Sequence, residues 1–217
     1  MLMILHVFKH ELRLIFREPR FWIPFVVPPI ILAASQGIAV SRYGTKIMEG
    51  SEGYMMLLLG CLMAPMGAPL AADSFAGERE RNSLELLQLS PVKPAVLFWG
   101  KLLAIVPFPL VFALLAESVY WAAHPQVSTV TAVAAILGAV SASLLINAFS
   151  LMMSLKVKTV RAAAHMTVFL LVPLLLLVQM FHEQYLVGLA MPIAVFAGSV
   201  VICGAAIAAG MRKFISL

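Results

Sequence analysis

The stretch VSTVTAVAAILGAVSASLLINAFSLMMSL, residues 127–155, decides the fold because it contains no Asp, Glu, Lys or Arg along its whole length. A helix needs about 20 consecutive apolar residues to cross a bilayer core of about 30 Å, and this stretch exceeds that length. His124-Pro125-Gln126 interrupts the helical pattern just before it, since proline lacks a backbone N–H and disfavours helix in the preceding residue. The sequence therefore predicts a transmembrane helix here.

Further stretches of similar length and low charge flank this one on both sides. The composition agrees, because 62% hydrophobic and 12% charged residues, with a mean hydropathy of +1.00, differ from the roughly 45–50% apolar and 25% charged residues of soluble domains. We therefore predict an all-α, polytopic membrane protein that forms one transmembrane domain over residues 1–217. Its six predicted spans are residues 21–41, 53–75, 96–121, 127–155, 162–181 and 185–211.

The Lys and Arg residues indicate which ends of these spans face the cytoplasm, because positive side chains stay on the cytoplasmic side of short loops. With the N-terminus inside, all 15 Lys and Arg residues except Arg42 and Lys46 fall on the cytoplasmic side. Both termini are therefore predicted to be cytoplasmic. This topology accounts for the net charge of +5 and argues against a nucleic-acid-binding surface.

Residues 1–20 resemble neither a span nor a polar tail. Ile4, Phe8, Leu12 and Ile15 recur at helical spacing, and basic residues occupy the other faces. This pattern predicts an amphipathic helix that lies on the inner leaflet before the chain turns into the membrane. An ordinary basic juxtamembrane segment is the alternative interpretation.

The longest predicted cytoplasmic loop joins the second and third spans and contains GERERNSLELLQLSPV, residues 77–92. Asn82 and Glu85 have the spacing of a capping box, although Ser or Thr normally leads that box. Pro91 ends the short helix that would follow.

Leucines give this short helix an apolar face, formed by Leu84 and Leu87 with Leu86 beside them. A helix of this kind is suited to docking into a groove on a soluble partner. It could equally pack only on its own bundle, and the residues alone leave both interpretations open.

The same segment, followed by Gly100-Lys101, resembles the signature of the type-2 ABC transporter permeases, in which GE-R leads into LE-LL, PV and GK-L. The opening segment FKHELRLIFREP, residues 8–19, is also similar to the opening of that family. Asn82 departs from the pattern, because many relatives carry glycine there. In such permeases the loop after the second span is a coupling helix that contacts an ATP-hydrolysing subunit. The resemblance places this role on Glu78, Arg79, Glu80, Leu84, Glu85 and Leu87.

The resemblance also implies a function and partners. The chain would be the membrane-spanning permease subunit of an ATP-driven exporter in the plasma membrane, with the bacterial cytoplasmic membrane as the expected one. Two permease chains, identical or related, would assemble with two ATP-binding subunits. Because the chain contains no G-x-x-x-x-G-K-[ST] phosphate loop, ATP and Mg²⁺ would be held by the partner, and this chain would need no cofactor or metal and would not be an enzyme.

Polar residues within the spans are the candidates for a transport pathway, because polar groups in a bilayer are costly and often functional. Gln36, Asn147 and Glu117 are such residues, and each could instead hydrogen-bond between helices. Glu117 follows Lys101 by roughly 24 Å of helix, which places it near the outer surface, where it could also snorkel. So little fixed charge favours an apolar or amphiphilic cargo, such as a lipid, peptide, drug or haem.

The second span contains both small residues and prolines. The small residues recur every fourth position, which lets another helix approach closely. Pro65 and Pro69 are expected to kink the same helix. The predicted helix-packing positions are Gly60, Ala64, Ala68 and Ala72.

Two other classes of protein remain as alternatives. A non-transporting membrane anchor or regulatory subunit would keep the bundle but would not need the leucine-faced loop. An intramembrane enzyme would need paired aspartates, a nucleophile with a base, or a His-Glu-x-x-His zinc site. The chain contains one Asp, and His182-Glu183 lacks a second His at the required spacing.

Overall fold

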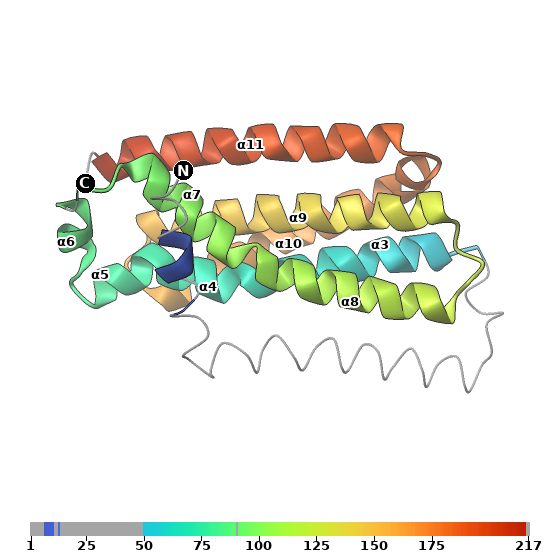
Figure 1. Ribbon diagram of the computed structural model, residues 1–217, viewed down its shortest axis with the longest axis horizontal. Coiled ribbons are helices and arrows are strands. Elements are labelled where there is room, and N and C mark those ends of the chain that lie inside the picture. The colour runs from blue at the N-terminus through green and yellow to red at the C-terminus, as the bar shows by residue number, and fades with distance from the viewer. Residues whose placement is uncertain (1–6, 11–12, 14–49, 90, 216–217) are drawn as a thin grey trace.

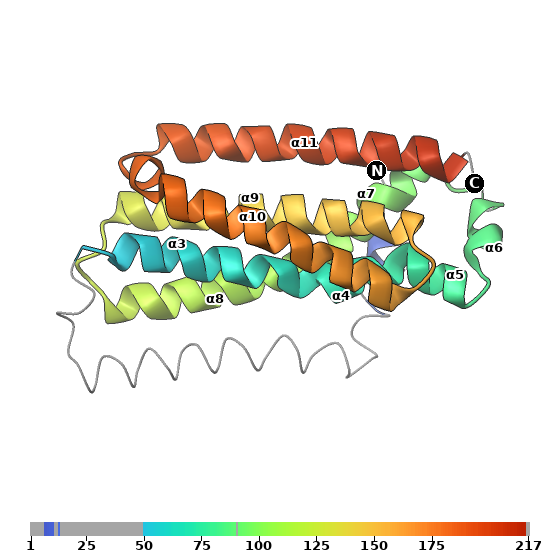
Figure 2. The same ribbon diagram turned by 180° about the vertical axis from the view of Figure 1, so that it is seen from behind.

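The computed structural model describes residues 7–10, 13, 50–89 and 91–215, and the regular structure within them is entirely helical (Figures 1 and 2). Long apolar stretches form helices because a helix satisfies its backbone hydrogen bonds internally. From residue 50 onward the elements are α3 (Glu52–Met63), the 3-10 turn η3 (Ala64–Gly67), α4 (Ala68–Ala72), the π-helical turn η4 (Asp73–Gly77), α5 (Glu78–Glu80), α6 (Leu84–Gln88), α7 (Pro94–Ile105), α8 (Pro107–Ala123), α9 (Thr129–Lys156), α10 (Val160–Leu186) and α11 (Ala190–Ile215).

Five helical runs in the described residues are long and apolar enough to cross a membrane. The elements from α3 to α5 form one continuous run, and α7 and α8 form another that is interrupted at Val106, just before Pro107. The predicted span at 21–41, which includes Gln36, lies outside the described residues. The five runs are Glu52–Glu80, Pro94–Ala123, Thr129–Lys156, Val160–Leu186 and Ala190–Ile215.

The boundary between the last two spans differs from the prediction. The sequence predicts a loop at residues 182–184, but α10 continues through them to Leu186 and the chain turns at residues 187–189. His182-Glu183-Gln184 is polar without containing a helix breaker, so a helix can carry these side chains past the membrane surface. Gly188 is the residue with low helix propensity, and it lies in the turn.

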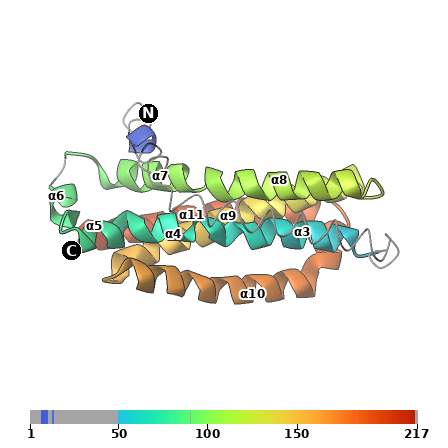
Figure 3. The same cartoon turned by 90° about the horizontal axis from the view of Figure 1, so that it is seen from below.

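Helix α9 lies in the centre of the described bundle and packs against α3, α8, α10 and α11 (Figures 1 and 3). Small residues along α9, including Ala135, Gly138 and Ala142, are buried and allow this close approach. Helix α10 is the most exposed span and presents large apolar side chains such as Phe169 and Leu176 to the surroundings. An apolar exterior over apolar spans suits contact with lipid.

The two ends of the bundle differ in composition. We define the α6 end as the end that carries α5, α6, the α9–α10 connection and the last turn of α11, and the His124 end as the opposite one (Figures 1 and 2). In residues 50–89 and 91–215, every Lys and Arg lies at or towards the α6 end. The acidic residues Glu52 and Glu183 lie at the His124 end.

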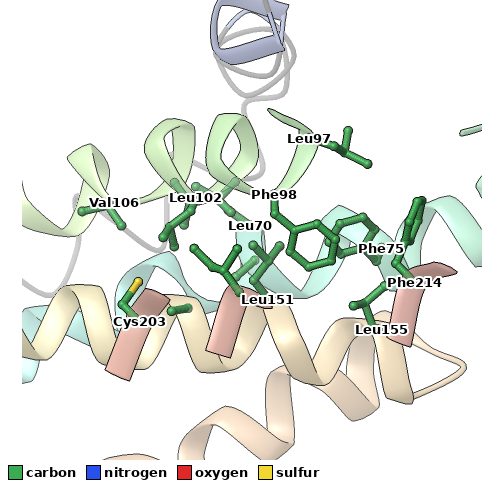
Figure 4. Close-up of a cluster of buried hydrophobic side chains, with 14 of the residues drawn as sticks. Leu70, Phe75, Leu97, Phe98, Leu102, Val106, Leu151, Leu155, Cys203 and Phe214 are labelled. Carbon is green, nitrogen blue, oxygen red and sulfur yellow. The ribbon is translucent and has the colours of Figure 1, made fainter. Parts of the chain in front are cut away.

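A cluster of buried hydrophobic side chains, which includes the neighbouring rings of Phe75, Phe98 and Phe214, fills the core towards the α6 end (Figure 4). The ring of Phe75 lies 4.8 Å from that of Phe98 and 5.8 Å from that of Phe214, so three helical runs meet here. The buried Lys101 ammonium lies 5.5 Å from the centroid of Phe75, which allows a cation–π contact. Residues 7–10 are helical, and Val7 packs against this cluster.

Candidate functional site

The segment after the second span ends its helix with a Schellman turn. The Asn82 N–H donates to the carbonyl of Arg79 (3.1 Å), and the Ser83 N–H donates to the carbonyl of Glu78 (2.9 Å). Asn82 has a φ of 56°, the left-handed conformation that this motif requires and that usually selects glycine. Asn82, which replaces the glycine of many relatives, is therefore the one non-glycine residue with positive φ in the described chain. Asparagine tolerates that conformation better than most residues.

The predicted capping box is wrong in detail. Ser83, rather than Asn82, is the N-cap residue of α6, and its side chain makes no cap hydrogen bond. The Ser83 hydroxyl instead lies within hydrogen-bonding distance of both the carboxylate and the main-chain carbonyl of Glu78. Glu78 and Ser83 thus brace the turn between α5 and α6.

Arg79 and Glu80 join this segment to the α9–α10 connection. The Arg79 guanidinium donates to the carbonyls of Val157 (2.7 Å) and Leu155 (3.0 Å), which are left free where α9 ends. The Glu80 carboxylate accepts from the N–H of Val160 (2.9 Å), at the positive N-terminus of α10. Two cytoplasmic connections of the predicted topology therefore form one hydrogen-bonded unit.

Helix α6 presents leucines in two directions. Leu84 is buried in the hydrophobic cluster of the α6 end, and Leu87 is half-buried against the same cluster, so these two members of the predicted apolar face pack on the bundle itself. Leu86 is 70% exposed and Leu89 is 83% exposed, and the predicted coupling residue Glu85 is exposed beside them. The protruding apolar surface is therefore formed by Leu86 and Leu89, which we call the α6 leucine pair.

A change from α-helix to 3-10 helix at Ala64–Gly67, within the second span, creates the site of Asn147. In η3 the Ala68 N–H donates to the carbonyl of Pro65, so the carbonyl of Ala64 lacks its usual helical donor. The Asn147 amide of α9 donates to this carbonyl (3.2 Å) and to that of Ser143 (2.7 Å). Asn147 is fully buried, and a Cβ atom at Gly67 would lie 2.9 Å from its Cγ, so glycine provides the space.

The four small residues predicted to pack helices are all buried. A Cβ atom at Gly60 would lie 2.8 Å from the Cβ of Ala139 in α9, so the two helices approach closely there. The Ala64 and Ala68 carbonyls accept from Asn147 and from Ser150 (3.4 Å) in the same helix. Ala72 lies in a small cluster with Ala163 of α10.

Glu117 lies on α8 and is 1% exposed, so it does not snorkel to the surface. Its carboxyl group contacts the position of Gly60, and neither carboxyl oxygen has a hydrogen-bond partner. The sequence placed Glu117 by its distance along the helix from Lys101. That distance does not tell whether the side chain faces the bundle or the surface, so the burial could not be predicted. In the described residues, no group of three or more His, Cys, Asp or Glu side chains could hold a metal ion.

The long apolar helices and the scarcity of charge within them define a multi-pass, α-helical membrane protein. A family model described as ABC-2 type transporter matches residues 3–183, and the chain therefore belongs to the ABC-2 type transporter family. Membership makes it a permease component of an ABC transporter, a transport subunit of a family that generally works with an ATP-binding ABC subunit. No curated protein and no solved structure matches the chain at a significant level.

Proposed function

We propose that this chain is the membrane-spanning subunit of an ATP-driven exporter and that the α5–α6 segment is its coupling element. The observation that carries the proposal is the α6 leucine pair, which protrudes from a segment that is itself hydrogen-bonded to the α9–α10 connection. A force on Leu86 and Leu89 would reach the spans through Arg79 and Glu80. Exposed apolar side chains on a braced helix suit docking into a groove of a partner.

The charge distribution supports the orientation. Basic residues concentrate at the α6 end, which would be cytoplasmic under the positive-inside rule. ATP and Mg²⁺ would then bind to a separate ATPase on that side. The membrane would be the plasma membrane, with the bacterial cytoplasmic membrane as our expectation.

The shape of the bundle supports a paired permease. Helix α9 occupies the centre of the described bundle, so a route for cargo would run between two permease chains rather than through one. Such a route would be lined largely by apolar side chains, because the described spans expose many large apolar residues, such as Phe169 and Leu176. We therefore propose an apolar or amphiphilic cargo, such as a lipid, hydrophobic peptide, drug or haem, and a second permease chain, identical or related.

Co-expression of the full chain with candidate ATP-binding subunits tests the coupling role. We expect L86D combined with L89D to lower ATPase co-purification and ATPase stimulation by about tenfold or more. V187D is the matched control, because Val187 is 86% exposed but lies in the α10–α11 turn at the His124 end. Unchanged assembly and stimulation in the double variant, or an equal loss in V187D, would contradict the proposal.

A further inference from the structure

We propose that Glu117 is the centre of a buried proton-binding site that is reached from the His124 end of the bundle through Tyr120 and His124. Glu117 and Tyr120 are three positions apart and lie on one face of α8, and His124, the C-cap residue of that helix, stacks on Tyr120. Glu117 is 1% exposed, Tyr120 2% and His124 0%. Three buried polar side chains thus follow one another from the end of α8 into an apolar bundle.

Unpaired polar atoms concentrate along this line. In the described part of the chain six buried side-chain N and O atoms lack a hydrogen-bond partner, and four of them are the two Glu117 carboxyl oxygens, the Tyr120 hydroxyl and His124 Nε2. Buried polar groups are normally paired, because an unpaired one forfeits its hydration. A row of such atoms is best explained by a ligand that pairs with them, and protons carried by internal water molecules are the ligand that fits.

The surroundings of Glu117 favour a carboxylic acid over a carboxylate. On α3 the nearest titratable group is the Cys61 thiol, and on α10 it is Tyr185, whose hydroxyl already donates to the carbonyl of Ala134 (3.1 Å). On α9 the residue that faces Gly60, beside the carboxyl group, is Ala139. No described Lys or Arg faces the carboxyl group to balance a negative charge, and an uncompensated charge in such a place is strongly disfavoured.

The His124 ring is placed to pass protons inward. It stacks on the Tyr120 ring with centroids 4.2 Å apart, and its Nδ1 lies 3.0 Å from the Tyr120 carbonyl oxygen. If Nδ1 carries the hydrogen in that contact, the unpaired Nε2 accepts a proton and the ring can then release one. The Tyr120 hydroxyl, which can both donate and accept, is the next unpaired polar group along the chain towards Glu117.

A polar cleft of about 380 Å³ lies at the His124 end and supplies access to water. Its lining includes Glu52, Gln126, His182 and Glu183. Glu52 also lies within electrostatic range of both His124 and Tyr120. A proton from water in the cleft would pass by way of Glu52, His124 and Tyr120, with internal water in the gaps, and would bind to a Glu117 carboxyl oxygen. Release reverses the transfer, so no other reactant is needed.

The proton site would make the α3–α8–α9 contact dependent on protonation. A protonated Glu117 fits the packed contact between these three helices. A Glu117 carboxylate requires hydration, so the contact would have to open to admit water. The site itself stands apart from the coupling proposal, and only the assignment of the cleft to the extracytoplasmic side rests on the proposed orientation.

Infrared spectroscopy of the full chain in lipid nanodiscs tests the site without an ATPase, so its failure would leave the coupling proposal untouched. At neutral pH we expect a carbonyl stretch from a protonated carboxylic acid that is lost in E117Q and kept in E183Q, a control that lines the cleft. In E117D, a second variant in case E117Q does not fold, the band should persist at a shifted frequency. A spectrum that is the same in wild type and E117Q, or a band that is unmoved in E117D, would overturn the proposal.

Deuterium exchange tests the route. After transfer into D₂O, the band should shift about tenfold or more slowly in H124F and in Y120F than in wild type, although the band itself remains. The control E85Q, an exposed residue at the α6 end, should exchange at the wild-type rate. Equal exchange rates in wild type, H124F and Y120F would overturn the assigned route.

Discussion

The two ends of the bundle differ in how their buried polar groups are paired. At the α6 end the charged side chains of α5 and the adjacent Arg81 are partnered, since Arg79 and Glu80 bind the backbone of the α9–α10 connection and Arg81 pairs with Asp73 at 3.1 Å. At the His124 end Glu117 and Tyr120 are buried with unpaired polar atoms. One end is therefore built to hold its shape, whereas the other retains groups whose protonation or hydration can change.

Two ionisable residues of a single helical run show the same difference. Lys101 and Glu117 both belong to the run Pro94–Ala123, and both are almost fully buried. The Lys101 ammonium lies over the Phe75 ring, whereas the Glu117 carboxyl group lies against Gly60 and neither of its oxygens has a hydrogen-bond partner. Burial alone therefore does not tell what a charged residue does in this bundle, because the partners decide it.

Removing the Arg79 side chain should have the largest effect on stability. R79A leaves the carbonyls of Leu155 and Val157 without their donors, and we expect the free energy of unfolding to fall by about 2 to 3 kcal/mol. R81A is the control, with an expected loss of less than about 1 kcal/mol because its ion pair is half exposed. Denaturant titration in mixed micelles measures both. Equal losses would show that surface charge, rather than the carbonyl contacts, stabilises this end.

An apolar replacement of Glu117 should act in the opposite direction. E117M removes two unpaired buried oxygens while keeping a side chain of similar length, so we expect the free energy of unfolding to rise by about 1 to 2 kcal/mol. E183M serves as the control, because Glu183 is exposed and should change stability little. The same titration measures both variants. A clear loss of stability in E117M would mean that internal water pairs with the carboxyl group more favourably than an apolar side chain packs there.

The spans could be predicted from the sequence because a membrane helix depends mainly on local composition. The stretch at 127–155 corresponds to α9, and Pro65 and Pro69 mark the place where the second span changes from α-helix to a 3-10 turn. The family signature at residues 77–92 was also visible, because those residue types recur in a fixed order.

The orientation of side chains could not be predicted, because it depends on neighbours that are distant in sequence. The burial of Glu117 depends on the glycine at position 60, and Asn147 is held by a carbonyl that the proline-containing turn sets free. In α6 nearly every position carries an apolar or long side chain, so periodicity could not tell that Leu84 faces the bundle and Leu86 faces outward.

The left-handed turn at Asn82 offers a smaller test of the braced end. N82A places a β-carbon in a conformation that asparagine and glycine tolerate, and we expect a loss of about 1 kcal/mol. N82G should keep the Schellman turn and lose no stability. Thermal unfolding of the three proteins under one condition ranks them. An N82A protein as stable as N82G would show that the turn between α5 and α6 does not constrain this end.

The α6 leucine pair should have the smallest effect on stability and thereby separates bracing from docking. L86S and L89S remove side chains that are 70% and 83% exposed, so the free energy of unfolding should change by less than about 0.5 kcal/mol. L84S, from the same helix, should cost about 2 kcal/mol because Leu84 is 8% exposed and packs in the core. Denaturant titration, paired with ATPase stimulation by the same variants, makes the comparison. Replacing a leucine that docks on the ATPase should lower ATPase stimulation without lowering stability. If L86S lowers both, Leu86 contributes to the fold rather than to an interface.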